Sequence, residues 1–254
     1  MHGRSRKKAR TKQETTIERI IDIRSRNIIH ALEALVRSPE PTIWIFGYGS
    51  LIWNPGFTYQ SSARAYLPGM SRRFWQGNFT HRGSKEMPGR VVTLVENPTE
   101  SAFGLLFKVT GLAAIIAALE HLYVREIEAG YVFKSVRVQQ VQNSSKSESS
   151  APENLDSQMA LTCIALPGND FYLGSGESEM MSWQIANAFG PAGPNCEYLL
   201  NLAAKMRELF PRVSDDHLFD LEKSVSRHLR KNDEMKAKEN IRSSNLDIKL
   251  SSSA

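Results

Sequence analysis

The spacing of apolar residues divides the chain into predicted helices and strands. Residues 14–36 carry isoleucine and leucine at steps of three and four with charged residues between them, which predicts an amphipathic helix. This helix should stop before Pro39 and Pro41, so residues 14–41 are predicted to be a helix followed by a linker. Residues 42–46 form a β-branched and aromatic run that ends at Gly47, which is typical of a buried strand.

From Gly47 onward, segments with the apolar spacing of helices alternate with segments typical of strands. Runs rich in β-branched and aromatic residues predict strands at 90–96, 102–109, 132–141 and 159–166. A helical pattern begins at Leu112 and extends to about Glu126. Residues 178–229 predict two or three helices, the first two separated by the turn-forming sequence FGPAGPN.

Two stretches lack the apolar residues that a core needs. Residues 142–158 are rich in Ser, Asn, Glu and Pro, which predicts a flexible insertion between two strands. The segment after Arg230 is polar and poor in aromatic residues, so residues 231–254 are predicted to be disordered. What remains is one predicted domain over residues 42–230, interrupted by the insertion.

The 254-residue chain has a formal net charge of +5, and this charge is concentrated at one end. Residues 1–13 hold six of the 32 Lys and Arg residues and no acid, which leaves 26 basic against 27 acidic residues elsewhere. The body is therefore nearly neutral, which argues against a nucleic-acid-binding surface. Residues 1–13 are predicted to be a disordered basic tail, interpreted as a nuclear localisation signal, an organelle presequence or a solvated tail.

Cysteine and histidine content favours a protein of a reducing compartment without a metal site. Cys163 and Cys196 form neither a disulfide framework nor a zinc spacing, and the six histidines lack any metal-binding spacing. The longest uncharged stretch that suggests a membrane span, residues 109–119, is too short to cross a bilayer. We therefore expect no metal, no membrane association and no secretory signal.

The sequence FGYGSL follows the predicted buried strand directly. Gly47 and Gly49 can adopt positive φ and let a ligand approach the backbone, and consecutive N–H groups in such a turn can bind a carboxylate or an oxyanion. The turn lacks the Lys-Ser or Lys-Thr pair of a phosphate-binding loop and the third glycine of a dinucleotide-binding motif. The alternative is a tight strand-to-loop turn in which Tyr48 is a core aromatic residue.

Glu126 is the candidate general acid or base. It follows Leu119 by seven residues, so on a continuous helix its side chain points with the apolar stripe of Ile115, Leu119 and Leu122. Burial raises the pKa of a carboxyl group toward neutrality, where the group can both accept and donate a proton. In the alternative interpretation the helix ends earlier, and Glu126 is solvated or paired with Arg125.

Residues 71–90 interleave arginines with aromatic residues. Because the body is nearly neutral, a small anionic ligand fits this segment better than nucleic acid does. One or two of the arginines could bind such a ligand through a carboxylate.

Seven blocks of sequence resemble the ChaC family of glutathione-specific γ-glutamylcyclotransferases, in order from about residue 44 to 229. They are FGYGSLIW, SRRFWQGN followed by HRG, PGRVVTL, L-x-x-R-E at 122–126, FYLG at 171–174, GPAGPNCEYL and DDHLFDLE. The resemblance implies an α+β fold, a small mixed β-barrel with flanking helices.

The resemblance also implies an activity, the conversion of glutathione to 5-oxoproline and cysteinylglycine. The α-amine of the substrate attacks its own γ-carbonyl, so the reaction needs no cofactor, metal or nucleophilic Ser or Cys. Glu126 is the implied catalytic base, glutathione the implied partner and the cytoplasm the expected location.

The same resemblance implies a set of substrate-binding residues. Backbone N–H groups of the glycine turn would bind the γ-glutamyl moiety, Arg72 is the candidate for the glycyl carboxylate, and three tyrosines match the family pattern. The predicted residues are Ile45, Phe46, Gly47, Tyr48, Gly49, Ser50, Leu51, Arg72, Tyr131 and Tyr172.

Three positions depart from the family pattern. Thr80 replaces an aspartate, His121 replaces a tyrosine, and Ala129 replaces the first residue of a Gly-Gly-Tyr sequence. They bear on substrate preference more than on catalysis, because they spare Glu126 and the glycine turn. Two alternatives therefore remain: a cyclotransferase for other γ-glutamyl amines or dipeptides, and a non-catalytic protein whose basic tail and 17–36 helix bind an unidentified partner.

Overall fold

The computed structural model describes residues 39–141 and 157–251. The predicted basic tail and N-terminal helix, and nearly all of the predicted insertion, lie outside these residues. The strands are β1 (Thr42–Gly47), β2 (Ser61–Asn78), β3 (Gly89–Thr110), β4 (Tyr131–Gln140), β5 (Ser157–Ala165), β6 (Phe189–Gly190) and β7 (Gly193–Pro194). The helices are the 3₁₀-helix η1 (Ser50–Ile52), α3 (Leu112–Leu122), the π-helix η2 (Tyr123–Ile127), α4 (Ser178–Asn187), α5 (Asn195–Leu209) and α6 (Asp216–Ser251).

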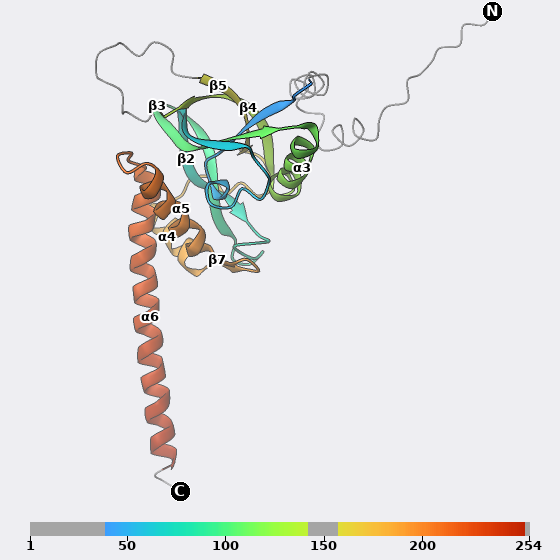
Figure 1. Ribbon diagram of the computed structural model, residues 1–254. Coiled ribbons are helices and arrows are strands. Elements are labelled where there is room, and N and C mark those ends of the chain that lie inside the picture. The colour runs from blue at the N-terminus through green and yellow to red at the C-terminus, as the bar shows by residue number, and fades with distance from the viewer. Residues whose placement is uncertain (1–38, 142–156, 252–254) are drawn as a thin grey trace, which may run out of the picture. The chain divides into compact units, whose positions relative to one another are not determined.

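Five strands close into a barrel in the order β1-β3-β2-β4-β5 (Figure 1). β1 runs antiparallel to β3 and parallel to β5, where Ile45 lies opposite Leu161, so the barrel is mixed. α3 packs beside β1. The predicted α+β fold with a small mixed barrel is confirmed.

The burial of each barrel strand explains how well its sequence predicted it. β1 buries four of its six residues, as its β-branched and aromatic run predicts. The two strands predicted at 90–96 and 102–109 are one long strand, β3, because the polar stretch between them keeps the extended conformation and lies at the exposed part of the strand. β2 is not among the predicted strands, because its buried positions include the polar residues Ser71, Arg72 and Gln76.

The chain divides into two compact units. The barrel unit comprises Met1–Ser71 and Glu96–Asp170, and the helical unit comprises Arg72–Val95 and Phe171–Ala254. Two of the three boundaries fall inside the long strands β2 and β3, and the third follows Asp170, after β5. Residues of the domain predicted over 42–230 thus belong to both units.

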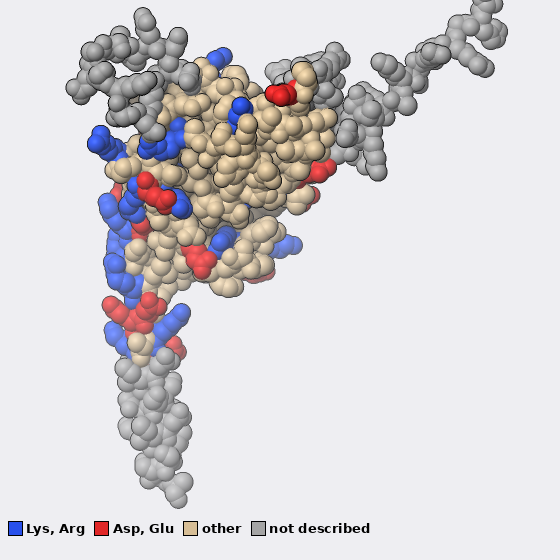
Figure 2. Space-filling model, viewed as in Figure 1, with Lys and Arg blue, Asp and Glu red and all other residues tan. Residues whose placement is uncertain are grey.

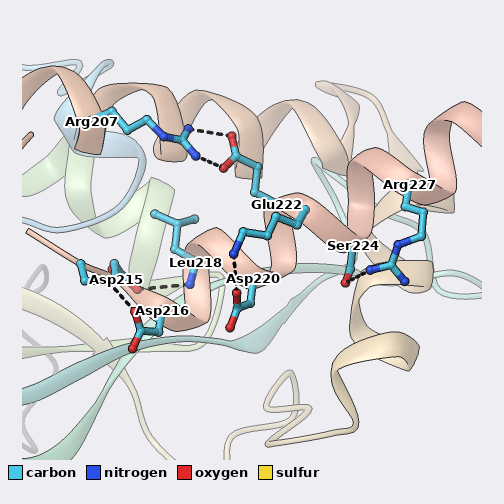
Figure 3. Close-up of polar contacts among 10 residues, drawn as sticks. Arg207, Asp215, Asp216, Leu218, Asp220, Glu222, Ser224 and Arg227 are labelled. Carbon is cyan, nitrogen blue, oxygen red and sulfur yellow. Dashed lines mark hydrogen bonds and ion pairs between the residues drawn. The ribbon is translucent and has the colours of Figure 1, made fainter.

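In the helical unit, α4 and α5 pack against α6. Leu218, Leu221 and Val225 are buried at helical spacing along α6. Arg207 of α5 forms a bidentate ion pair with Glu222 of α6, and Asp215 accepts a hydrogen bond from the Leu218 N–H at 3.2 Å, which caps the start of α6 (Figure 3).

The end of α6 corrects the prediction of disorder after residue 230, because the helix continues to Ser251. Residues 231–239 are rich in Lys, Glu, Met and Ala, which are strong helix formers. They extend a helix that is already formed, so they avoid the cost of nucleation. Acidic and basic side chains alternate along the described part of α6 (Figure 2), as expected for a solvated helix.

None of the helices described is long and apolar enough to cross a membrane.

Candidate active site

The glycine turn, residues 47–51, connects β1 to η1 in the barrel unit. Neither Gly47 nor Gly49 uses the positive φ that glycine permits, and Gly49 precedes η1 with φ −123° and ψ −134°. Gly47 is needed for close packing instead, since a Cβ atom there would lie 2.7 Å from the Cβ of Leu51. The turn is therefore held tightly against the strand that leads into it.

Backbone N–H groups of the turn are available for a ligand. The first N–H groups of a helix have no partner within the helix. Those of Ser50 and Leu51, at the start of η1, have none among the described residues. The side chains of Ile45, Phe46 and Leu51 are buried in the core, so these residues can offer a ligand mainly their backbone.

Tyr48 connects the turn to β5. Its hydroxyl donates a hydrogen bond of 2.6 Å to the carbonyl oxygen of Cys163, and its side chain is buried. The predicted alternative for Tyr48, a core aromatic residue, agrees with this burial. The hydrogen bond fixes the position of the turn relative to the end of β5.

A π-helix presents Glu126, where the sequence predicts one continuous α-helix. α3 ends at Leu122, and η2 continues with wider i to i+5 winding, a feature that is frequent at functional sites. Val124 on this turn is 63% exposed, whereas the side chain of Glu126 is only 16% exposed. The wider turn thus directs the carboxylate toward the protein.

Two opposing effects act on Glu126. Burial raises the pKa of its carboxyl group, and the Arg125 guanidinium lowers it, with a net shift upward. The Arg125 Nε atom lies 3.0 Å from Oε1 of Glu126. Both sequence interpretations of Glu126 are therefore partly right, because the carboxylate is mostly buried and also paired with Arg125.

Arg125 also contacts the glycine turn. Its Nη2 donates to Ser50 Oγ and its Nη1 to the carbonyl oxygen of Asn54, each at 2.6 Å. The sequence predicted Arg125 only as an alternative partner of Glu126, so its contacts with the glycine turn were not predicted. The available signal was its place directly before the candidate carboxylate.

Strands β4 and β5 form another side of the site. Tyr131 lies opposite Ala165, and Phe133 lies opposite Cys163, so all four side chains share one face of the sheet. Burial raises the pKa of the Cys163 thiol well above its usual range, and the charge of Glu126 adds to this shift. Cys163 is therefore a protonated neighbour of Glu126, and Tyr131 lies buried on the same sheet face.

The remaining two predicted residues belong to the helical unit. Arg72 has a side chain only 1% exposed and donates to Asp215 Oδ2 at 2.6 Å, which favours a structural role over binding a glycyl carboxylate. Tyr172 forms an isolated bridge with Gln76, and burial raises the pKa of its hydroxyl.

The described residues include no group of three or more His, Cys, Asp or Glu side chains placed to hold a metal ion. What the barrel unit offers is a carboxyl group with a raised pKa, a guanidinium beside it and backbone N–H groups on the adjoining turn. Fold and site thus define a small mixed-barrel protein with a carboxyl group suited to proton transfer.

Comparison with known proteins identifies the family within this class of small mixed-barrel proteins. The ChaC-like protein family matches residues 43–228. Glutathione-specific gamma-glutamylcyclotransferase 1 of Danio rerio is 42% identical over 187 residues, covering 73% of this chain and 90% of the relative. The Homo sapiens protein of the same name is 41% identical over 179 residues, covering 69% and 75%.

A solved structure agrees with these relatives. A γ-glutamyl cyclotransferase specific to glutathione from yeast superposes with a TM-score of 0.65 at 26% identity, over 74% of this chain and 96% of that one. The chain belongs to the ChaC-like protein family.

Proposed function

We propose that this protein degrades glutathione by cyclising its γ-glutamyl group to 5-oxoproline and releasing cysteinylglycine. Its relatives carry that specificity in their names, and they match most of the chain. One observation carries the proposal: the carboxyl group of Glu126, which has a raised pKa, lies on the π-helix η2 and is joined through Arg125 to the glycine turn.

The proposed mechanism uses Glu126 twice. The carboxylate takes a proton from the α-ammonium group of the substrate, and the freed amine attacks the γ-carbonyl carbon. Attack leaves the ring nitrogen with two protons, one more than 5-oxoproline keeps. The C–N bond to the cysteinyl nitrogen then breaks as Glu126 delivers the first proton to that nitrogen. The second proton passes from the ring nitrogen to the released amine, so cysteinylglycine leaves with an ammonium group and no external nucleophile is consumed.

In this proposal the turn 45–51 orients the γ-glutamyl group. The N–H groups of Ser50 and Leu51 are suited to the oxyanion that develops on the γ-carbonyl oxygen, since donors fixed in advance stabilise such charge. Holding the amine near the carbonyl supplies the entropy advantage of an intramolecular reaction. Tyr48 and Tyr131 lie at the border of the same site. Arg72 and Tyr172 are weaker candidates for binding the rest of the substrate.

The direct test is 5-oxoproline release from glutathione by wild-type protein and by Glu126→Gln. We expect release by the wild type and a loss of about 1,000-fold or more in the variant, because Gln cannot transfer the proton. Circular dichroism should show an unchanged fold. Full activity in Glu126→Gln, with the fold intact, would remove Glu126 from the mechanism.

Substrate choice needs its own comparison, because His121 and Ala129 depart from the family pattern. Glutathione, γ-glutamyl-alanine and γ-glutamyl-lysine should be assayed side by side. We expect a kcat/KM for glutathione at least tenfold above the others. Equal values would favour a general γ-glutamyl cyclotransferase instead.

We propose a cytoplasmic location, supported by the two free, buried cysteines, which suit a reducing compartment. The basic residues of segment 1–13 are the candidate for nuclear targeting or for binding a partner. Imaging the full chain and a chain without residues 1–13 tests the targeting role: redistribution on deletion supports targeting, and an unchanged distribution contradicts it.

A further inference from the structure

Arg125 makes three contacts with three different groups of the site. Its Nε lies 3.0 Å from Glu126 Oε1, its Nη2 donates to Ser50 Oγ, and its Nη1 donates to the Asn54 carbonyl oxygen. The three nitrogens of one planar group are thus all occupied. Among the described residues, only Arg125 forms an ion pair or hydrogen bond with the carboxylate of Glu126.

The two other contacts of Arg125 bracket η1. Ser50 begins this short helix, and Asn54 follows its end, with the Asn54 N–H donating back to the Ser50 carbonyl oxygen at 2.9 Å. The guanidinium therefore fixes the position of η1 relative to the carboxylate. A misplacement of about 1 Å between reacting groups can cost about 100-fold in rate.

We propose that Arg125 is the positioning residue of this site, setting the distance and orientation of Glu126 relative to the glycine turn. The inference rests on the proposed function of Glu126 and adds a second residue to it. Arg125 acts through Glu126 and η1 and need not touch the substrate. Lysine cannot replace it fully, because an ammonium group lacks the planar fork that reaches three acceptors at once.

The charge of Arg125 has a separate effect from its geometry. The charged and titratable groups that interact with it are Glu126, the Cys163 thiol and the His121 ring, whose pKa is lowered by burial and by the charge of Arg125. Since the guanidinium opposes the effect of burial on Glu126, its removal should raise the pKa of Glu126 further. Charge and geometry can therefore be separated by two substitutions.

The experiment compares Arg125→Met with Arg125→Lys, using glutathione and measuring kcat and KM from pH 5 to pH 9. Arg125→Met should lower kcat about 100-fold with KM changed less than threefold. Its acid limb in kcat/KM should move to higher pH, because Glu126 must lose its proton to act as a base. In Arg125→Lys the acid limb of the kcat/KM profile should return toward its wild-type position, while kcat should stay at least tenfold below the wild-type value.

Arg137→Lys is the matched control, because Arg137 is an exposed arginine on β4 in the same unit. It should keep wild-type kinetics. Ser50→Ala removes one of the three contacts and should lower kcat by a smaller factor than Arg125→Met does.

Each outcome decides the proposal. Wild-type kcat and an unshifted acid limb in Arg125→Met would overturn it, while an inactive Glu126→Gln would still support the proposed function. Loss of activity in Arg125→Met that reflects unfolding is recognised by circular dichroism, and Arg125→Lys then decides: unchanged kcat overturns the proposal. If Glu126→Gln is fully active, the proposed function itself fails.

Discussion

Each unit of the molecule contains an arginine paired with a carboxylate, and the two pairs are built differently. In the helical unit, Asp215 uses one oxygen for Arg72 at 2.6 Å and the other for the Leu218 N–H at the start of α6. In the barrel unit, Glu126 shares only Oε1 with Arg125, and burial keeps its pKa raised in spite of that charge.

The comparison shows how local bonding separates a structural carboxylate from a chemical one. A carboxylate whose oxygens are both bonded to the chain is fixed in place and holds chain segments together. A mostly buried carboxylate with one oxygen bonded pays for desolvation without full compensation, and so exchanges protons more easily. We therefore propose a structural role for the Arg72–Asp215 pair and a chemical role for the Arg125–Glu126 pair.

Arg72→Met should have the largest effect on stability. The substitution leaves Asp215 without its cation in a largely buried position, and we expect a loss of about 3 kcal/mol in the free energy of unfolding. Urea denaturation measures this loss, with Arg137→Met as an exposed control that should change little. A stable Arg72→Met protein whose KM for glutathione rises tenfold would restore Arg72 as a substrate-binding residue.

Asp215→Asn should cost less, about 2 kcal/mol, because the amide oxygen can still accept one hydrogen bond but loses its charge. Thermal unfolding at neutral pH gives the difference. The rate of 5-oxoproline release measured well below the melting temperature should stay within twofold of wild type. A large loss of rate without a loss of stability would break the distinction between the two pairs.

Glu126→Gln replaces the carboxylate of the other pair by an amide in the same way. Its effect on the free energy of unfolding should be the smallest of the three and of opposite sign. The raised pKa means that the folded protein disfavours the charged carboxyl, so the neutral amide should stabilise the fold by up to about 1 kcal/mol. The gain should vanish below about pH 4, where the carboxyl is protonated in both states. It should grow as the pH rises from the pKa of the unfolded chain toward the pKa of folded Glu126, and level off above that pKa. Destabilisation at neutral pH would show that Glu126 is a structural anion like Asp215.

Much of the barrel could be predicted from the sequence, because β1, β4 and β5 carry the expected β-branched runs and most residues of β1 and β5 are buried. β2 could not, because its interior includes Arg72. The arginine-rich segment 71–90 suggested a ligand site, yet Arg72 and Arg90 are buried with internal partners, Arg90 donating to Gln184 and to two backbone carbonyls.

The site was predictable in its residues more than in its geometry. Seven-residue spacing brought Glu126 to the apolar side of the helix, but periodicity alone cannot reveal the π-turn that presents it. The role of Arg125 depends on a contact between residues 75 positions apart in sequence, from Arg125 to Ser50. The conformational freedom of glycine drew attention to Gly47 in the sequence, whereas in the structure close packing requires a glycine there.

The most direct test of the account is a ¹³C NMR titration of the Glu126 side-chain carboxyl, assigned by comparison with Glu126→Gln. We predict a midpoint above the ordinary glutamate value of about 4.3, coinciding with the acid limb of kcat/KM for glutathione. A midpoint at or below the ordinary value, or one that does not follow the acid limb, would contradict the assignment of Glu126 as the group that transfers the proton.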